Sequence, residues 1–98
     1  MWFLTSLLVR GESIENPSLG VDTHRTFGFY KEHHDAVEAV IENRCNMHEC
    51  LYNYLVLENF EEGIHPLATA EEWYRWDGRW VPCSKPTDLE HLISWALG

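Results

Sequence analysis

The chain has 98 residues, of which 45% are hydrophobic and 13% aromatic, so it is long and apolar enough to fold as one domain with a single core. Its 16 acidic and 7 basic residues give a net charge of −9 at pH 7. That balance disfavours direct binding to a nucleic acid, because contacts to the phosphate backbone need cations. The composition therefore excludes a disordered chain and a basic nucleic-acid binder.

The first element expected is a buried strand over Trp2–Val9, where the chain is continuously apolar. This run is too short to span a membrane, and it has neither a basic region before it nor a small-residue cleavage pattern after it. We therefore expect a cytoplasmic protein without a membrane partner. A loop is expected over Arg10–Asp22, because Gly11, the Asn16-Pro17 step and Gly20 break any periodicity.

A second strand and a helix are expected next. Alternation over Arg25–Tyr30 predicts a strand with Phe27 and Phe29 on one face. Residues His33–Arg44 then predict an amphipathic helix. Its apolar positions recur at helical spacing and are Ala36, Val37, Val40 and Ile41.

The third strand is predicted over Tyr52–Phe60, because Tyr54–Leu57 form a continuous apolar run. Such continuity is typical of a strand covered on both faces, so we place this strand at the centre of the sheet. A strand, a helix and a strand in this order suit a crossover connection that joins parallel strands. An antiparallel arrangement is the alternative, and the sequence leaves both open.

An aromatic β-hairpin is predicted over Glu71–Pro82, because large alternating side chains flank an Asp77-Gly78 step. A two-residue type I′ loop at this step would place Arg75 opposite Trp80 and stack the guanidinium on the indole ring. Aromatic side chains on a hairpin are most often core packing. Because aromatic residues fall on both sides of this hairpin, one side also suits a binding surface.

A second helix is predicted at the end of the chain, where Thr87 and Glu90 form a capping box. Its apolar stripe consists of Leu89, Leu92, Ile93, Ala96 and Leu97. The elements together predict one α+β domain over residues 1–98. We expect a small single-layer sheet of about five strands, mixed or antiparallel, with two helices packed on it in the order β-β-α-β-β-β-α.

The cysteines and histidines are the residues that could bind a metal ion or act in catalysis. Zinc accepts Cys and His ligands, but the spacing here is not that of a structural zinc module. The candidate metal ligands are Cys45, His48, Cys50 and Cys83. Within His33-His34-Asp35, adjacent helical residues do not face each other, so no acid–base pair is expected. The common enzyme signatures are absent, and we expect a protein without catalytic activity, bound metal or cofactor.

The acidic residues are concentrated in one interval. No Lys or Arg occurs between Arg44 and Arg75, although that interval holds six glutamates. Solubility alone would explain this charge, whereas a basic protein partner would give it a specific role. The residues predicted to contact such a partner are Glu58, Glu61, Glu62, Glu71, Glu72, Trp73, Tyr74, Trp76 and Trp80.

Several of these segments together resemble a family of short, mostly uncharacterised proteins of gut bacteria, their phages and mobile elements. The segments, spanning residues 25 to 86, are Arg25–Tyr30, the helix with Ala36, Val37, Val40 and Asn43, His48-Glu49, Tyr54, Glu62–Pro66 and Glu72–Trp76. None of these motifs carries a known activity. The resemblance implies a context in which small acidic proteins, anti-CRISPR proteins among them, inhibit host defence by presenting carboxylates in place of nucleic-acid phosphates.

Three functions remain open from the sequence. The first is a non-enzymatic, anti-CRISPR-like inhibitor that binds a basic host protein, with a homodimer through the hairpin as a further arrangement. The second is a small-molecule binder or sponge for a nucleotide signal. Its phosphate-binding residues would be Arg25, Arg75 and Arg79. The third is a metal protein or enzyme that uses the cysteines and His48.

Overall fold

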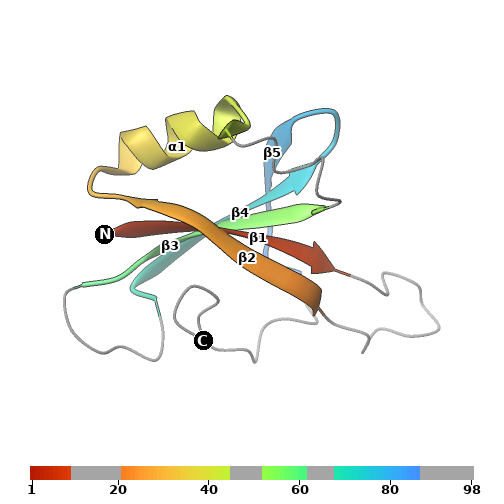
Figure 1. The fold of residues 1–98 in the computed structure, drawn as a ribbon, viewed down its shortest axis with the longest axis horizontal. Helices are drawn as coiled ribbons and strands as arrows, with labels where there is room; N and C mark the ends of the chain where they lie inside the picture. The colour runs from red at the N-terminus through yellow and green to blue at the C-terminus, as the bar shows by residue number, and fades with distance from the viewer. Residues whose placement is uncertain (10–20, 45–51, 62–67, 87–98) are drawn as a thin grey trace.

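A computed structural model describes residues 1–9, 21–44, 52–61 and 68–86 (Figure 1). Its elements are β1 (Trp2–Val9), β2 (Val21–Tyr30), α1 (His33–Ile41), β3 (Tyr54–Asn59), β4 (Ala70–Trp76) and β5 (Trp80–Cys83). The five strands form one sheet in the order β2-β1-β3-β4-β5, and all neighbours are antiparallel. An α+β fold with one antiparallel sheet is therefore confirmed, whereas the predicted C-terminal helix lies outside the described residues.

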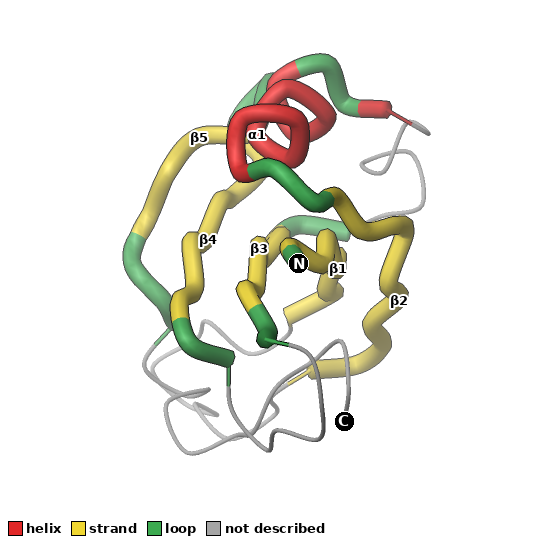
Figure 2. Tube along the Cα trace, turned by 90° about the vertical axis from the view of Figure 1, so that its left-hand side faces the viewer, coloured by secondary structure: helices red, strands yellow, loops and turns green. Residues whose placement is uncertain are grey.

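The connection from β2 to β3 passes over β1. Both β2 and β3 pair antiparallel with β1, so they run parallel to each other on its two sides. Helix α1 joins them and lies against the sheet, with β5 on one side of it and β2 on the other (Figure 2). The connection is therefore a crossover between two parallel strands, as one of the two alternatives predicted, but β1 lies between the strands that it joins. The predicted central position of β3 is confirmed by the strand order.

The sheet carries apolar clusters on both faces. The cluster under α1 is formed by Leu4, Ala36, Ala39, Val40, Leu55, Leu57, Tyr74 and Trp80. The cluster on the other face contains Leu7, Val56 and Trp73. Strand β3 supplies buried residues to both clusters, as its continuous apolar run predicted. Within the described part of the chain, no helix is long and apolar enough to cross a membrane.

The second strand departs from the predicted alternation because it contains a β-bulge. Leu4 lies opposite Gly28 and Thr5 lies opposite Thr26, which leaves Phe27 as an extra residue in β2. Phe27 packs against the cluster under α1, whereas the Phe29 side chain is 63% exposed. The two rings therefore do not share a buried face. The strand also begins at Val21, inside the segment predicted as a loop.

The hairpin is confirmed, but its predicted register was wrong by one residue. Trp76 lies opposite Trp80, and Arg75 lies opposite Val81. Within the described residues only Gly78 and Asn43 have positive φ, so Asp77 does not adopt the conformation that a type I′ loop requires. The Trp80 ring therefore faces Trp76, with ring centroids 5.2 Å apart, rather than the Arg75 guanidinium.

Helix α1 ends earlier than the sequence predicted, and its last residue is exposed. Ala36 and Val40 are buried against the sheet as expected. Ile41 was predicted to share this buried stripe, but its side chain is 70% exposed. A step of one residue rotates the side chain by about 100°, which turns Ile41 away from the position of Val40. The chain leaves the helix through Asn43, whose φ of 49° is the left-handed conformation common at helix ends.

Candidate functional site

A surface recess lies between the end of α1 and strand β5. It has a volume of about 310 Å³ and is lined by Ile41, Arg79, Trp80, Val81 and Pro82. We call it the α1–β5 recess. The indole N–H of Trp80 donates a hydrogen bond of 3.0 Å to the Asn43 side-chain oxygen, which joins β5 to the segment after α1. Its apolar lining and the exposed Ile41 make the recess suitable for an apolar side chain of a partner.

The helix beside this recess is acidic on its outer side. Carboxylates three and four residues apart share one side of a helix. In and next to α1 these are Glu32, Asp35, Glu38 and Glu42, all exposed or partly exposed. Glu42 pairs with Arg44 at 2.8 Å, and this bond raises the pKa of the Arg44 guanidinium. The helical spacing of these carboxylates was visible in the sequence, but the prediction concentrated on the interval after Arg44.

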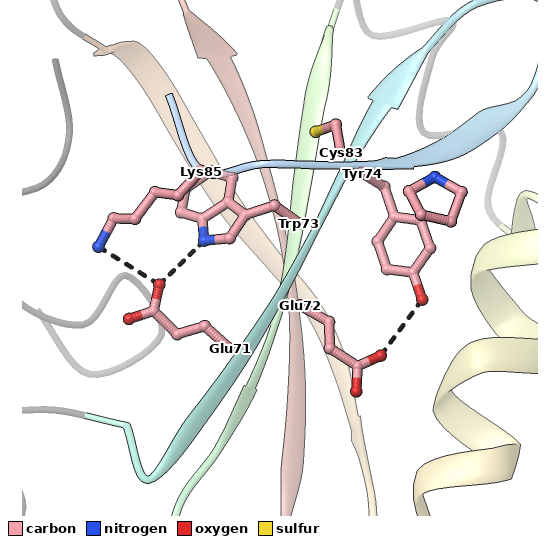
Figure 3. A pocket seen from close by; sticks show the side chains of 7 residues that line it. Glu71, Glu72, Trp73, Tyr74, Cys83 and Lys85 are labelled. Carbon is pink, nitrogen blue, oxygen red and sulfur yellow. Dashed lines mark hydrogen bonds and ion pairs between the residues drawn. The ribbon is translucent and has the colours of Figure 1, made fainter. Parts of the chain in front are cut away.

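A larger cavity, of about 570 Å³, opens at the edge of β4, where β5 ends (Figure 3). The β4–β5 pairing stops at Trp73 and Cys83, so the outer side of β4 before Trp73 has no paired strand among the described residues. The cavity lies at this point, and we call it the β4 edge cavity. Its lining residues are Glu71, Glu72, Trp73, Tyr74, Pro82, Cys83 and Lys85.

On one side of β4, Glu71 is held by two donors. The ammonium group of Lys85 lies 3.3 Å from its carboxylate, and the indole N–H of Trp73 donates to the same oxygen at 2.9 Å. The Lys85 ammonium group also lies 5.9 Å from the centre of the Trp73 ring. Lysine, carboxylate and indole therefore form one compact group on this face (Figure 3).

On the other side of β4, Glu72 connects the sheet to the start of α1. Its carboxylate lies 2.6 Å from Nε2 of His33 and accepts a hydrogen bond of 3.4 Å from the Tyr74 hydroxyl. Burial, together with the charge of Glu72, raises the pKa of Tyr74 to about 12. A histidine oriented by a carboxylate is one part of an acid–base site.

The residues predicted to contact a partner are not all at the surface. Glu58 is only 1% exposed and can contribute charge but no direct contact. Glu61 and Glu71 are exposed, Glu72 is partly exposed, and Glu62 lies outside the described residues. The aromatic residues Trp73, Tyr74 and Trp80 are buried, whereas Trp76 is partly buried. The hairpin aromatics are therefore primarily core residues, distributed over both faces of the sheet.

The three arginines predicted to hold phosphate are dispersed. Arg25 belongs to β2, whereas Arg75 belongs to β4, and two strands separate them in the sheet. Arg79 lies in the hairpin loop and lines the α1–β5 recess. Arg25 lies over the Phe27 ring at 5.0 Å. This arrangement does not form one site in which Arg25 acts with the other two.

Of the four candidate metal ligands, only Cys83 belongs to the part of the chain that the structure describes. Cys45, His48 and Cys50 lie outside the described residues. Cys83 is partly buried and packs against the cluster of Leu7, Val56 and Trp73. Over residues 1–9, 21–44, 52–61 and 68–86, the structure holds no group of three or more His, Cys, Asp or Glu side chains that could bind a metal ion.

Comparisons with protein families, with curated proteins and with solved structures found no match to this chain. The resemblance to short proteins of gut bacteria and their phages therefore stays a prediction.

Proposed function

We propose that this protein is a non-enzymatic interaction protein that binds a basic region of another protein through α1 and the α1–β5 recess. The exposed Ile41 carries this proposal, because its apolar side chain lines the recess and Glu42 follows it directly at the end of α1. Apolar contacts at the centre with charged residues at the rim are the usual composition of a protein interface. A partner with one apolar side chain between basic ones fits this arrangement.

The charge of the chain favours the same partner. At −9, the protein attracts a basic surface over a distance of about one Debye length, roughly 8 Å at physiological salt. The carboxylates of Glu38 and Glu42 would then pair with basic side chains, while the recess takes the apolar one. Arg79 adds a positive charge to the lining of the recess. A partner that places a basic group directly at Arg79 is therefore disfavoured.

The proposal is tested with two substitutions that change net charge equally. Glu38 lies on the outer side of α1, and Glu61 is exposed beyond β3. We expect Glu38→Lys to weaken capture of a basic protein from host lysate at least about tenfold, and Glu61→Lys to weaken it about threefold or less. Ile41→Asp should weaken capture as much as Glu38→Lys.

Two results would contradict this site. Equal losses from Glu38→Lys and Glu61→Lys would mean that only net charge matters, and capture unchanged by high salt would remove the electrostatic part. The anti-defence role predicted from the sequence has its own test. The captured protein should then be a nucleic-acid-binding defence protein whose activity falls when this chain is added.

The β4 edge cavity favours small-molecule binding as a second candidate function. Its volume of about 570 Å³ is in the range of cavities that hold ligands, and its lining combines aromatic and charged side chains. A nucleotide would bind through Lys85 rather than through the dispersed arginines. Nucleotides that raise the melting temperature of the protein but not of Lys85→Met would support this function, and no shift with any of them would refute it.

A further inference from the structure

The side chain of Lys85 lies against the protein instead of extending into water. Only 24% of this side chain is exposed, whereas lysine side chains are mostly exposed in folded proteins. Its ammonium group lies 3.3 Å from the Glu71 carboxylate and 5.9 Å from the centre of the Trp73 ring. Figure 3 shows this side chain beside both residues. The β4 edge cavity therefore already holds one primary ammonium group.

The two residues that hold this ammonium group are themselves fixed by the sheet. Trp73 is buried, and its indole N–H donates a hydrogen bond of 2.9 Å to the same Glu71 oxygen that Lys85 contacts. Both residues belong to β4 and pair with β3, where they lie opposite Val56 and Glu58. A carboxylate that is already held in place loses little conformational freedom when a cation binds to it. Glu71 and Trp73 thus form a preorganised acceptor for an ammonium group.

The charges in the lining favour a cation over an anion. The lining contains the two carboxylates of Glu71 and Glu72 and the one ammonium group of Lys85. Glu72 contacts His33 and Tyr74 on the other side of β4, whereas Lys85 contacts Glu71. The chain as a whole carries a net charge of −9, which raises the concentration of cations near its surface. An external cation is therefore attracted to this cavity, where it competes with Lys85 for Glu71.

Space for a ligand remains beside Lys85. Lys85 belongs to the lining, so the volume of about 570 Å³ lies next to its side chain. This volume falls within the range of about 300 to 1,000 Å³ that is usual for ligand sites. Strand β5 ends at Cys83, two residues before Lys85. The lysine side chain can therefore move away from Glu71 without breaking a strand pair.

We propose that the β4 edge cavity binds a primary alkylammonium group, which replaces the ammonium group of Lys85 between Glu71 and Trp73. The bound group donates N–H hydrogen bonds to the Glu71 carboxylate and lies beside the Trp73 ring, while its alkyl chain occupies the cavity. Lys85 is then an internal competitor that the ligand displaces. Such a group is carried by a free amine or by a lysine side chain of another protein. This site is separate from α1, where the proposed basic partner binds.

An alkylammonium ligand and a nucleotide make opposite demands on Lys85. A nucleotide phosphate needs the ammonium group of Lys85, whereas an alkylammonium ligand competes with it. Lys85→Met removes the charge and keeps a long unbranched side chain. The same variant should therefore lose binding of a nucleotide and gain affinity for an amine, which separates the two ligands of this cavity.

The test is titration of the isotope-labelled full chain with n-butylammonium, followed through the NMR signal of the Trp73 indole N–H. This probe has the alkyl chain and the ammonium group of a lysine side chain. We expect Lys85→Met to bind it at least about fivefold more tightly than the unmodified chain, because the ion pair and the ring contact of Lys85 no longer compete. The matched control is Lys31→Met, which removes the same charge at the other lysine of the chain, an exposed residue. It should bind like the unmodified chain.

Two further comparisons identify the groups that bind each other. Glu71→Gln, combined with Lys85→Met, keeps an oxygen for the Trp73 indole N–H but removes the charge, so it should weaken binding at least about tenfold. Tetramethylammonium has the same charge as the probe but no N–H, and it should bind Lys85→Met at least about fivefold more weakly than n-butylammonium does. Equal binding of the two cations would overturn the proposal. So would equal affinities of Lys85→Met and Lys31→Met, because net charge alone would explain them.

A lysine peptide distinguishes the two sources of the ligand. A short peptide with one lysine, blocked at both ends, presents the same ammonium group on a backbone. Binding to Lys85→Met more than about threefold tighter than that of n-butylammonium would assign the site to a lysine of another protein, and equal or weaker binding would assign it to free amines. Either result supports the proposal. Failure of this site would leave capture of a basic protein through α1 intact, because that binding is tested with Glu38→Lys.

Discussion

The two edges of the sheet are built in different ways. β5 has four residues, includes Pro82, which offers no N–H to a neighbouring strand, and borders the α1–β5 recess. β2 has ten residues, contains no proline and exposes Phe29. Short strands and prolines are the usual protection of an edge against pairing with other chains. The comparison shows that the two edges carry different protection: β5 is short and contains a proline, whereas the longer β2 contains a β-bulge at Phe27.

The aromatic residues at the two edges differ in their exposure to solvent. Trp80 in β5 is buried, packs with Trp76 and donates a hydrogen bond to Asn43. Phe29 in β2 is largely exposed. We therefore expect Trp80 of β5 to contribute more to folding stability than Phe29 of β2. Three experiments test this difference.

The largest expected effect is the contrast between Trp80→Ala and Phe29→Ala. Removal of the buried indole should lower the free energy of unfolding by about 3 to 5 kcal/mol, because it leaves a cavity and removes the hydrogen bond to Asn43. Truncation of the exposed Phe29 should lower it by about 1 kcal/mol or less. Urea denaturation measures both. Similar losses for the two variants would contradict this difference.

The next effect concerns Tyr74 and Glu72 in β4, next to the protected edge. The folded chain holds the pKa of Tyr74 at about 12, above the usual value of 10.0, so the protonated hydroxyl is favoured by folding. Stability from this group is fully present below pH 10 and is lost as the pH rises toward 12. Tyr74→Phe removes this dependence. The difference in unfolding free energy between the two proteins should change by about 2 kcal/mol across this range.

Urea denaturation of both proteins at pH 9 and at pH 11.5 gives that difference directly. Other titrating groups affect both proteins alike and cancel in the comparison. A constant difference at the two pH values would show that Tyr74 titrates as it does in the unfolded chain.

The smallest expected effect on stability, and the most direct test of the comparison, is Pro82→Thr. Threonine gives β5 an additional backbone N–H, so this edge of the sheet becomes more available for pairing with another chain. We expect a change in unfolding free energy of about 1 kcal/mol or less, but light scattering should reveal assemblies at high concentration that the unmodified chain does not form. Ser84→Thr, which adds the same residue after the strand, should form none. Identical scattering from both variants would mean that Pro82 does not protect this edge.

The position of β3 could be predicted from the sequence because its signal is local. A continuous apolar run indicates burial on both faces, and Tyr54–Asn59 indeed supplies both clusters. The bulge at Phe27 was missed, since one extra residue in a short alternating segment leaves the pattern looking regular. The hairpin register was missed for a different reason. Packing of Trp76 and Trp80 on one face, under α1, prevails over the turn preference of Asp77-Gly78.

The surface was less predictable than the sheet. Glu71 and Glu72 lie at the edge of β4, but their partners Lys85 and His33 are remote from them in sequence, so the sequence could not show that these carboxylates are engaged. Ile41 was assigned to the core because it falls at helical spacing. Its exposure depends on where α1 ends, and helix ends are the least predictable part of a helix.

The crossover of α1 above β1 also has a consequence for biosynthesis. β1 precedes every other described element, yet it lies inside the sheet between β2 and β3. As the chain leaves the ribosome, β1 can pair at once with β2, but its other side stays unpaired until β3 has emerged. At this stage the unpaired side of β1, next to Leu4 and Leu7, can accept a strand from another chain. The time needed to translate the residues between Tyr30 and Tyr54 sets how long this stage lasts.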